Sequence, residues 1–156
     1  LAELEKDYNV VVITQNVDDL HERAGSTNII HLHGELLKMR GVDDPYTFYD
    51  CTEDIKVGDL SPNGAQLRPH IVWFGEDVPM IVKAAEEVET ADIVLIVGTS
   101  LQVYPAAGLM NCAEEGTPIY YVDPRPSISS KNNITVIKDV ASTGVAKAIE
   151  LIKELK

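Results

Sequence analysis

The sequence predicts an α/β fold, with a mostly parallel sheet and helices on both of its faces. Short apolar runs rich in β-branched residues recur along the chain, helical patterns lie between them, and turn residues separate the two. The chain has 156 residues, of which 45% are hydrophobic. This length fits one folded domain. No apolar run approaches the ~18–20 residues of a membrane span.

Five apolar runs are predicted to be buried strands, at residues 10–13, 71–74, 93–97, 119–122 and 134–137. Helical patterns occupy three segments. The first covers residues 79–89, where Asp77 and Pro79 form an N-terminal signal. The second covers residues 104–115 and ends before Gly116. The third follows Ser142, a candidate N-cap, and carries one apolar stripe.

Residues 41–66 have a different composition. They contain Asp-Asp-Pro at 43–45, Ser-Pro-Asn-Gly at 61–64 and few aliphatic residues. Such turn-rich composition predicts an excursion from the sheet, with one short hairpin at residues 46–49. The segment is too small for a core of its own.

The net charge and the cysteines limit the partners and the compartment. A formal net charge of −12 argues against a nucleic-acid partner, because phosphates would be repelled. It suits a lysine-bearing protein partner, or simply an acidic surface in water. Cys51 and Cys112 form neither a disulfide framework nor a zinc site. We therefore expect a reducing, cytoplasmic setting.

The segment Thr-Gln-Asn-Val-Asp-Asp-Leu-His at residues 14–21 directly follows the first predicted strand. Ligands of open α/β sheets bind at the carboxyl ends of strands. The amide of Asn16 and the carboxylate of Asp18 suit a ligand rich in hydroxyls and carboxamides. The alternative is a plain helix start, with Asn16 or Asp18 as the N-cap.

His31 and His33 form the second motif. On a strand they would point to the same face. Gly34 follows His33 and permits close approach by another backbone or a ligand, so His33 is a candidate for proton transfer near neutral pH. A metal pair is an alternative that lacks an evident third ligand, and a structural histidine is another.

Three further segments lie at strand ends. Val-Trp-Phe-Gly-Glu at residues 72–76 is either core or a strand edge that accepts an extended peptide. Gly-Thr-Ser at 98–100 offers backbone N–H groups and hydroxyls to phosphate. Asp123 ends another strand, where a carboxylate can pair with ribose hydroxyls.

In this order, the motifs resemble the sirtuin family of NAD-dependent protein-lysine deacylases. The matching pieces are residues 14–18, the step from His33 to Gly34, residues 72–76, residues 98–100 and Val-Tyr-Pro-Ala-Ala at 103–107. The resemblance runs from about residue 10 to residue 155. Leu-Leu-Lys-Met-Arg at 36–40 and Leu-Arg-Pro-His at 67–70 are most similar to a bacterial branch that includes desuccinylases and deacetylases.

The resemblance implies a Rossmann-like fold, NAD as cofactor, an acyl-lysine protein or peptide as partner, and neither nucleic acid nor membrane. The implied reaction removes acyl groups from lysine side chains and releases nicotinamide and O-acyl-ADP-ribose. In it the acyl oxygen attacks the ribose carbon that bears nicotinamide. The catalytic histidine, which His33 matches, then takes a proton from a ribose hydroxyl. The cofactor contacts match Gln15, Asn16, Asp18, Gly98, Thr99, Ser100, Asp123 and Ala141. The acyl-lysine tunnel and peptide groove match Val72, Phe74, Gly75, Glu76 and Val103.

The sequence departs from the family in three places. The family's glycine-rich opening segment and first strand are expected upstream of Leu1, so we expect a fragment with impaired activity. The family's two Cys-x-x-Cys pairs are missing, with Gly41 in place of the first cysteine and Cys51 solitary. We therefore expect no zinc and no other metal ligands. Asp123 stands where the family usually has asparagine.

The predicted organisation is a partial NAD-binding Rossmann-like domain formed by residues 1–40 and 67–156. Residues 41–66 form a small subdomain that replaces the zinc module. The alternative function is a non-catalytic NAD or ADP-ribose binding domain of a larger protein, and a third reading is an inactive structural fragment. His33 together with Asn16 and Asp18 favours the enzyme, because a binding module needs no neutral histidine beside the ribose.

Overall fold

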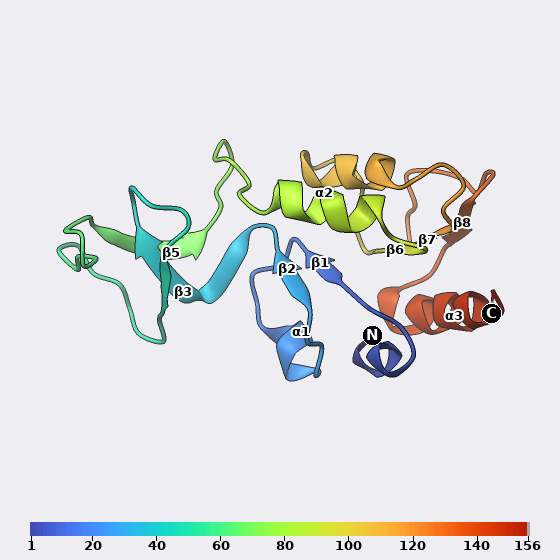
Figure 1. The fold of residues 1–156 in the computed structure, drawn as a ribbon, viewed down its shortest axis with the longest axis horizontal. Coiled ribbons are helices and arrows are strands. Elements are labelled where there is room, and N and C mark those ends of the chain that lie inside the picture. Colours follow the sequence, from blue (N-terminus) through green and yellow to red (C-terminus); the bar gives the residue numbers. More distant parts are fainter. Residues whose placement is uncertain (156) are drawn as a thin grey trace. The chain divides into compact units, whose positions relative to one another are not determined.

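The computed structural model describes residues 1–155 and has the predicted α/β class (Figure 1). The chain divides into two compact units, one from Leu1 to Ala84 and one from Ala85 onward. Helix α2 (Ile81–Glu89) crosses the boundary. The predicted division at residues 41 and 66 stays a prediction. Within residues 1–155, no helix combines the length and apolar character needed to cross a bilayer.

The first unit contains a parallel pair of strands. A 3-10 helix, η1 (Ala2–Lys6), precedes β1 (Val12–Thr14), and β2 (Ile29–His31) pairs with β1 so that Thr14 lies opposite His31. The short helix α1 (Leu20–Arg23) lies in the crossover between the two strands (Figure 1). Ile30 and Leu32 are each only 1% exposed. Their burial fixes the carboxyl end of β2. Gln15 follows the end of β1, and His33 follows the end of β2.

The first unit also contains an antiparallel sheet of order β4-β3-β5. Its central strand is β3 (Gly34–Gly41), flanked by β4 (Phe48–Asp50) and β5 (Leu67–Ile71). The sequence did not predict β3. The predicted hairpin at 46–49 is wrong, because the residues of β4 pair with β3 and not with one another.

The predicted strand at residues 71–74 is also misplaced. Strand β5 ends at Ile71, and the next residues form a turn closed by the Glu76 N–H, which donates to the Trp73 carbonyl at 3.0 Å. Gly75, with φ of +87°, supplies the left-handed backbone that this turn requires. The apolar run therefore marks a strand end followed by a turn.

The second unit is a parallel sheet of order β6-β7-β8, as predicted. Its strands are β6 (Val94–Val97), β7 (Ile119–Val122) and β8 (Ile134–Ile137). All four residues of β7 are buried. Such burial matches the continuous apolar runs of the sequence, which are typical of a covered parallel sheet.

Two helix predictions in the second unit need correction. The segment at 104–115 forms a shorter 3-10 helix, η2 (Ala106–Cys112), and Gly108 in its interior disfavours a regular α-helix. The last helix, α3 (Ala141–Lys153), has Val140 as its N-cap in place of Ser142. Helix α3 packs close to β7 at Gly144. A Cβ on this residue would overlap a methyl group of Val122.

Candidate functional site

The carboxyl ends of β1 and β2 bring Gln15 and His33 together. The parallel register places Thr14 opposite His31, so the following residues leave the pair at one edge. The Nδ1 atom of His33 lies 3.1 Å from the Gln15 carbonyl oxygen. A carbonyl only accepts, so Nδ1 is the donor, and in the neutral ring Nε2 carries the lone pair. His33 is therefore held in the tautomer that a general base needs.

The segment carrying Asn16 and Asp18 is fixed by its own backbone. The Asn16 N–H donates to the Thr14 hydroxyl at 3.1 Å, and the Leu36 N–H donates to the Val17 carbonyl at 2.7 Å. One carboxylate oxygen of Asp18 accepts the Leu20 N–H at 3.1 Å. Asp18 thus closes a local turn just before α1, but the N-cap of this helix is Asp19, so the interpretation of Asn16 or Asp18 as the N-cap is wrong. Asn16 is exposed.

Gly34 is required by a close approach between two strands. Its φ is +84°, and a Cβ there would lie 2.8 Å from the His70 carbonyl carbon and closer still to the oxygen. Directly beside it, the Val72 N–H donates to the His33 carbonyl at 2.9 Å. The backbone of the predicted base is therefore hydrogen-bonded to the first residue predicted to line the substrate tunnel.

The turn at residues 73–76 presents apolar surface to solvent. Phe74 is 99% exposed and Trp73 is 57% exposed. Glu76 holds this turn: its carboxylate accepts the Trp73 N–H at 3.0 Å and a charged hydrogen bond from Arg68 at 2.6 Å. The Arg68 hydrogen bond is the main reason that the pKa of Glu76 lies below its usual value. The structure gives Glu76 a positioning part at this turn.

In the second unit, residues 98–100 follow β6 at the carboxyl edge of the sheet. Gly98 has φ of +62°, and its N–H donates to the Val122 carbonyl at 2.9 Å. The fully buried Tyr121 donates its hydroxyl to the Thr99 carbonyl at 2.7 Å. These bonds fix the start of the loop from beneath. A Cβ added at Gly98 would meet no heavy atom within 4 Å, so the loop borders open space.

Asp123 lies at the same edge, directly after β7. Its N–H donates to the Ile137 carbonyl at 3.2 Å, and one carboxylate oxygen accepts the Arg125 N–H at 2.7 Å. Ala141 opens α3 shortly after β8 and is exposed. Val103 is 43% exposed. Residues 98–100 and Asp123 therefore share one edge of this unit, while His33, Asn16 and Val72 gather in the other unit.

Two residues that position these groups were not predicted from the sequence. Arg68 holds the turn through Glu76, and Tyr121 holds the loop through Thr99. Arg68 lies within the Leu-Arg-Pro-His motif at residues 67–70, and Tyr121 lies within the strand predicted at 119–122. A tyrosine in an otherwise aliphatic buried strand is a usable signal, because a buried hydroxyl needs a partner.

Comparison with known proteins gives consistent results. The model of the Sir2 family matches residues 1–105. An NAD-dependent protein deacylase from Aggregatibacter actinomycetemcomitans is 58% identical over 127 residues, which are 81% of this chain and 61% of that protein. One from Bacteroides thetaiotaomicron is 51% identical over 159 residues, covering 97% of this chain and 68% of that protein. A crystal structure of a Sir2 homologue–NAD complex superposes with a TM-score of 0.80 at 34% identity, covering 99% of this chain and 62% of the other.

Proposed function

Because the chain belongs to the Sir2 family, we propose that its protein removes acyl groups from protein lysine side chains in an NAD-dependent reaction. The products are nicotinamide and O-acyl-ADP-ribose. The observation that supports this most directly is the tautomer of His33, whose Nδ1–H is held by Gln15 while Nε2 keeps its lone pair. A module that only bound a nucleotide would not need a histidine prepared in this way.

The described residues suit NAD as the cofactor. The amide of Asn16 both donates and accepts, as recognition of a carboxamide demands, and the carboxylate of Asp18 accepts from hydroxyls. The loop at 98–100 carries the hydroxyls of Thr99 and Ser100, and the position of a Cβ at Gly98 borders open space, which suits phosphate. Asp123 is assigned to the adenosine ribose and Ala141 to the adenine end. When bound, NAD supplies the ribose carbon that receives the acyl oxygen as nicotinamide departs.

Proton transfer and substrate binding are assigned to residues of this chain. Nε2 of His33 accepts a proton from a ribose hydroxyl, so that this oxygen can attack the acyl carbon. Val72 offers backbone groups to the substrate, and Phe74 covers the apolar stem of the acyl-lysine. Gly75 and Glu76 shape the turn that carries Phe74, and Val103 is assigned to peptide binding.

The partner is an acyl-lysine protein or peptide, in keeping with the relatives' name of protein deacylase. The net charge of −12 favours substrates with basic residues around the acyl-lysine. Cys51 and Cys112 are free, which agrees with a cytoplasmic setting.

The test is an assay of nicotinamide release from NAD with acetyl-, succinyl- and fatty-acyl-lysine peptides, using protein expressed from the complete reading frame. We expect at least one acyl peptide to be turned over. His33→Ala should lower kcat by about 10²–10⁴-fold, the range that a general base contributes, while NAD binding measured by calorimetry is retained.

His21→Ala is the matched control, because His21 lies on α1 away from the Gln15 contact. It should keep most of the activity. If NAD binds but no acyl peptide yields nicotinamide, the protein is a non-catalytic binding domain. If His33→Ala retains activity, the base has been assigned to the wrong residue.

A further inference from the structure

We propose that Glu22, His31 and Glu35 form a binding site for a divalent transition-metal ion. The three residues come from α1, β2 and β3 of the first unit, and their ligand atoms all lie within 4.8 Å of one another. The spacing in the sequence offered His31 no third ligand. The fold brings two carboxylates close to it. Glu22 stands nine residues before His31 in the sequence, and Glu35 stands four residues after it. The site adjoins Asn16 and Asp18, which are proposed to contact NAD, but its test by metal binding needs no deacylase activity.

The hydrogen bonds of His31 point to a cation. Its side chain is only 8% exposed, and its Nδ1 lies 3.3 Å from the Asn16 carbonyl oxygen. Because that oxygen can only accept, Nδ1 is the donor and the lone pair of Nε2 faces outward. Nε2 lies 2.7 Å from a carboxylate oxygen of Glu22. Two acceptors at this distance require a positive species between them, either a proton or a metal ion.

The Asn16 contact suits a metal ligand. Histidines that bind metals almost always donate their second ring N–H to a carbonyl or a carboxylate, which fixes the ring and raises its basicity. His31 already has this arrangement, with the Asn16 carbonyl outside the cluster as its acceptor. The buried imidazole is therefore oriented in advance, while the side chains of Glu22 and Glu35 are 40% and 27% exposed and can adjust.

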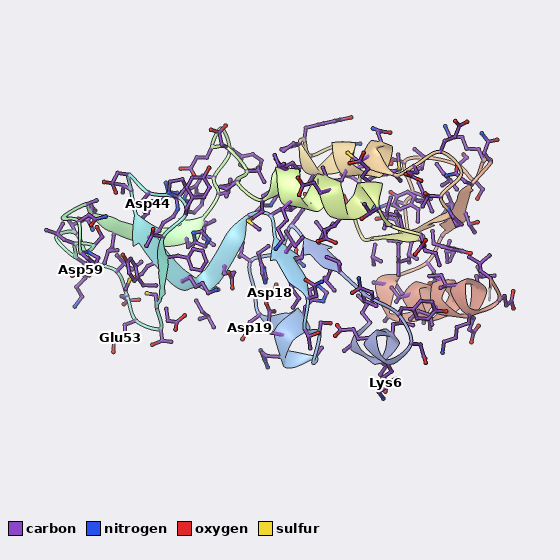
Figure 2. The ribbon with its side chains drawn as sticks, viewed as in Figure 1. Lys6, Asp18, Asp19, Asp44, Glu53 and Asp59 are labelled. Atoms are coloured by element: carbon purple, nitrogen blue, oxygen red, sulfur yellow. The ribbon has the colours of Figure 1, made fainter. Side chains whose placement is uncertain are left out.

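The surroundings of the cluster are strongly acidic. A cavity of about 190 Å³ borders it. Besides the two glutamates, the cavity is lined by three carboxylates, those of Asp18, Asp19 and Asp50, and by the ammonium of Lys38. Figure 2 shows Asp18 and Asp19 close to the start of α1. Lys38 lies 2.9 Å from Glu35 and Arg23 lies 3.8 Å from Asp19, so two cationic side chains accompany the five carboxylates. The remaining excess attracts a divalent cation.

The geometry requires only a modest contraction. Metal bonds of about 2.0–2.2 Å to nitrogen and oxygen place the ligand atoms of a tetrahedral site roughly 3.3 Å apart. In the structure the ligand atoms of the three residues lie within 4.8 Å of one another. One imidazole and two carboxylates suit zinc, cobalt or manganese better than the hard calcium ion. The lack of cysteine pairs excludes a cysteine-ligated zinc module and does not affect this site, which needs no thiolate.

Cobalt is the probe that tests the proposal. The full chain is titrated with Co²⁺ at pH 7.5, and binding is followed by calorimetry and by visible absorption. We expect one ion per chain, displaced by Zn²⁺. Each of His31→Gln, Glu22→Gln and Glu35→Gln should weaken binding by at least about tenfold, as loss of a ligand costs at least what loss of a supporting partner does.

His21→Gln is the matched control, since it removes a histidine from the same helix as Glu22 but outside the cluster; it should bind Co²⁺ as tightly as the wild type. If His31→Gln fails to fold by circular dichroism, the two more exposed glutamate variants decide. Affinity weaker than millimolar would mean that only a proton bridges His31 and Glu22, and the proposal would fail. Binding of Ca²⁺ as tight as Co²⁺ and unchanged in the three variants would reduce the site to nonspecific acidic attraction.

Discussion

Replacing Gly34 with alanine should destabilise the first unit more than replacing Gly64 with alanine, although the two glycines have the same φ of +84°. Gly34 has φ of +84° and a Cβ there would overlap the His70 carbonyl. The left-handed conformation costs an alanine about 1–2 kcal/mol. The overlap adds about 1–3 kcal/mol, the usual cost of forcing extra atoms into a packed region. The expected loss is therefore about 2–5 kcal/mol.

Gly64→Ala provides the matched control. Gly64 also has φ of +84°, but nothing lies within 4 Å of the position of its Cβ. This variant should lose only the backbone cost of about 1–2 kcal/mol. The entropy change of the unfolded chain is the same in both variants and cancels. The difference between the two, about 1–3 kcal/mol, then isolates the contact between β3 and β5.

Urea unfolding measures both variants. Trp73, the single tryptophan, lies in the first unit and reports its unfolding by fluorescence, while circular dichroism follows the whole chain. In a separate thermal unfolding experiment, each kcal/mol lost should lower the midpoint temperature of an 84-residue unit by roughly 4–8 °C. Equal losses in Gly34→Ala and Gly64→Ala would refute the close approach of β3 to the His70 backbone.

Three further changes test the second unit. Gly144→Ala should destabilise it by about 1–3 kcal/mol, despite alanine's better helix propensity, because the new methyl group overlaps β7; thermal unfolding checks this. Tyr121→Phe should cost about 1–3 kcal/mol and weaken NAD binding in calorimetry, because it leaves the Thr99 carbonyl without its donor. Hydrogen bonding to Lys147 lowers the pKa of Asp139 from 3.8 to about 2. Its stabilisation is therefore complete above pH 3.8 and is lost as the pH falls through about 2, so Asp139→Asn should flatten the acid unfolding curve there.

The local pattern of apolar residues predicted the strands of the second unit. The runs at 93–97, 119–122 and 134–137 became β6, β7 and β8. The middle strand, β7, is buried along its whole length, as a strand covered on both faces is. Strand β3 escaped prediction for the opposite reason. Leu36 and Leu37 are both exposed, so no alternation of buried and exposed residues marks it. Its formation depends on partners about 10 and 30 residues further along the chain.

The candidate site was predictable where it follows strand ends, and not where it depends on packing. The segments carrying Asn16, His33 and Asp123 could be found because each follows an apolar run. The contact of His31 with Glu22, by contrast, depends on where α1 sits against β2, which no local pattern records. Hydrogen bonds between residues of different elements thus decided both the tautomer of His33 and the surroundings of His31.

His33 and Gly34 both contact the backbone at residues 70–72, so variants of either residue can change the same region. The His33 carbonyl accepts the Val72 N–H, and the missing side chain of Gly34 lets β3 approach the backbone at His70. A side chain at Gly34 would therefore displace the predicted base and the predicted tunnel together. Lost activity in Gly34→Ala would reflect changed geometry, whereas His33→Ala removes the imidazole and leaves the backbone bond to Val72 available. Comparing the two separates loss of the proton acceptor from loss of its alignment with the substrate.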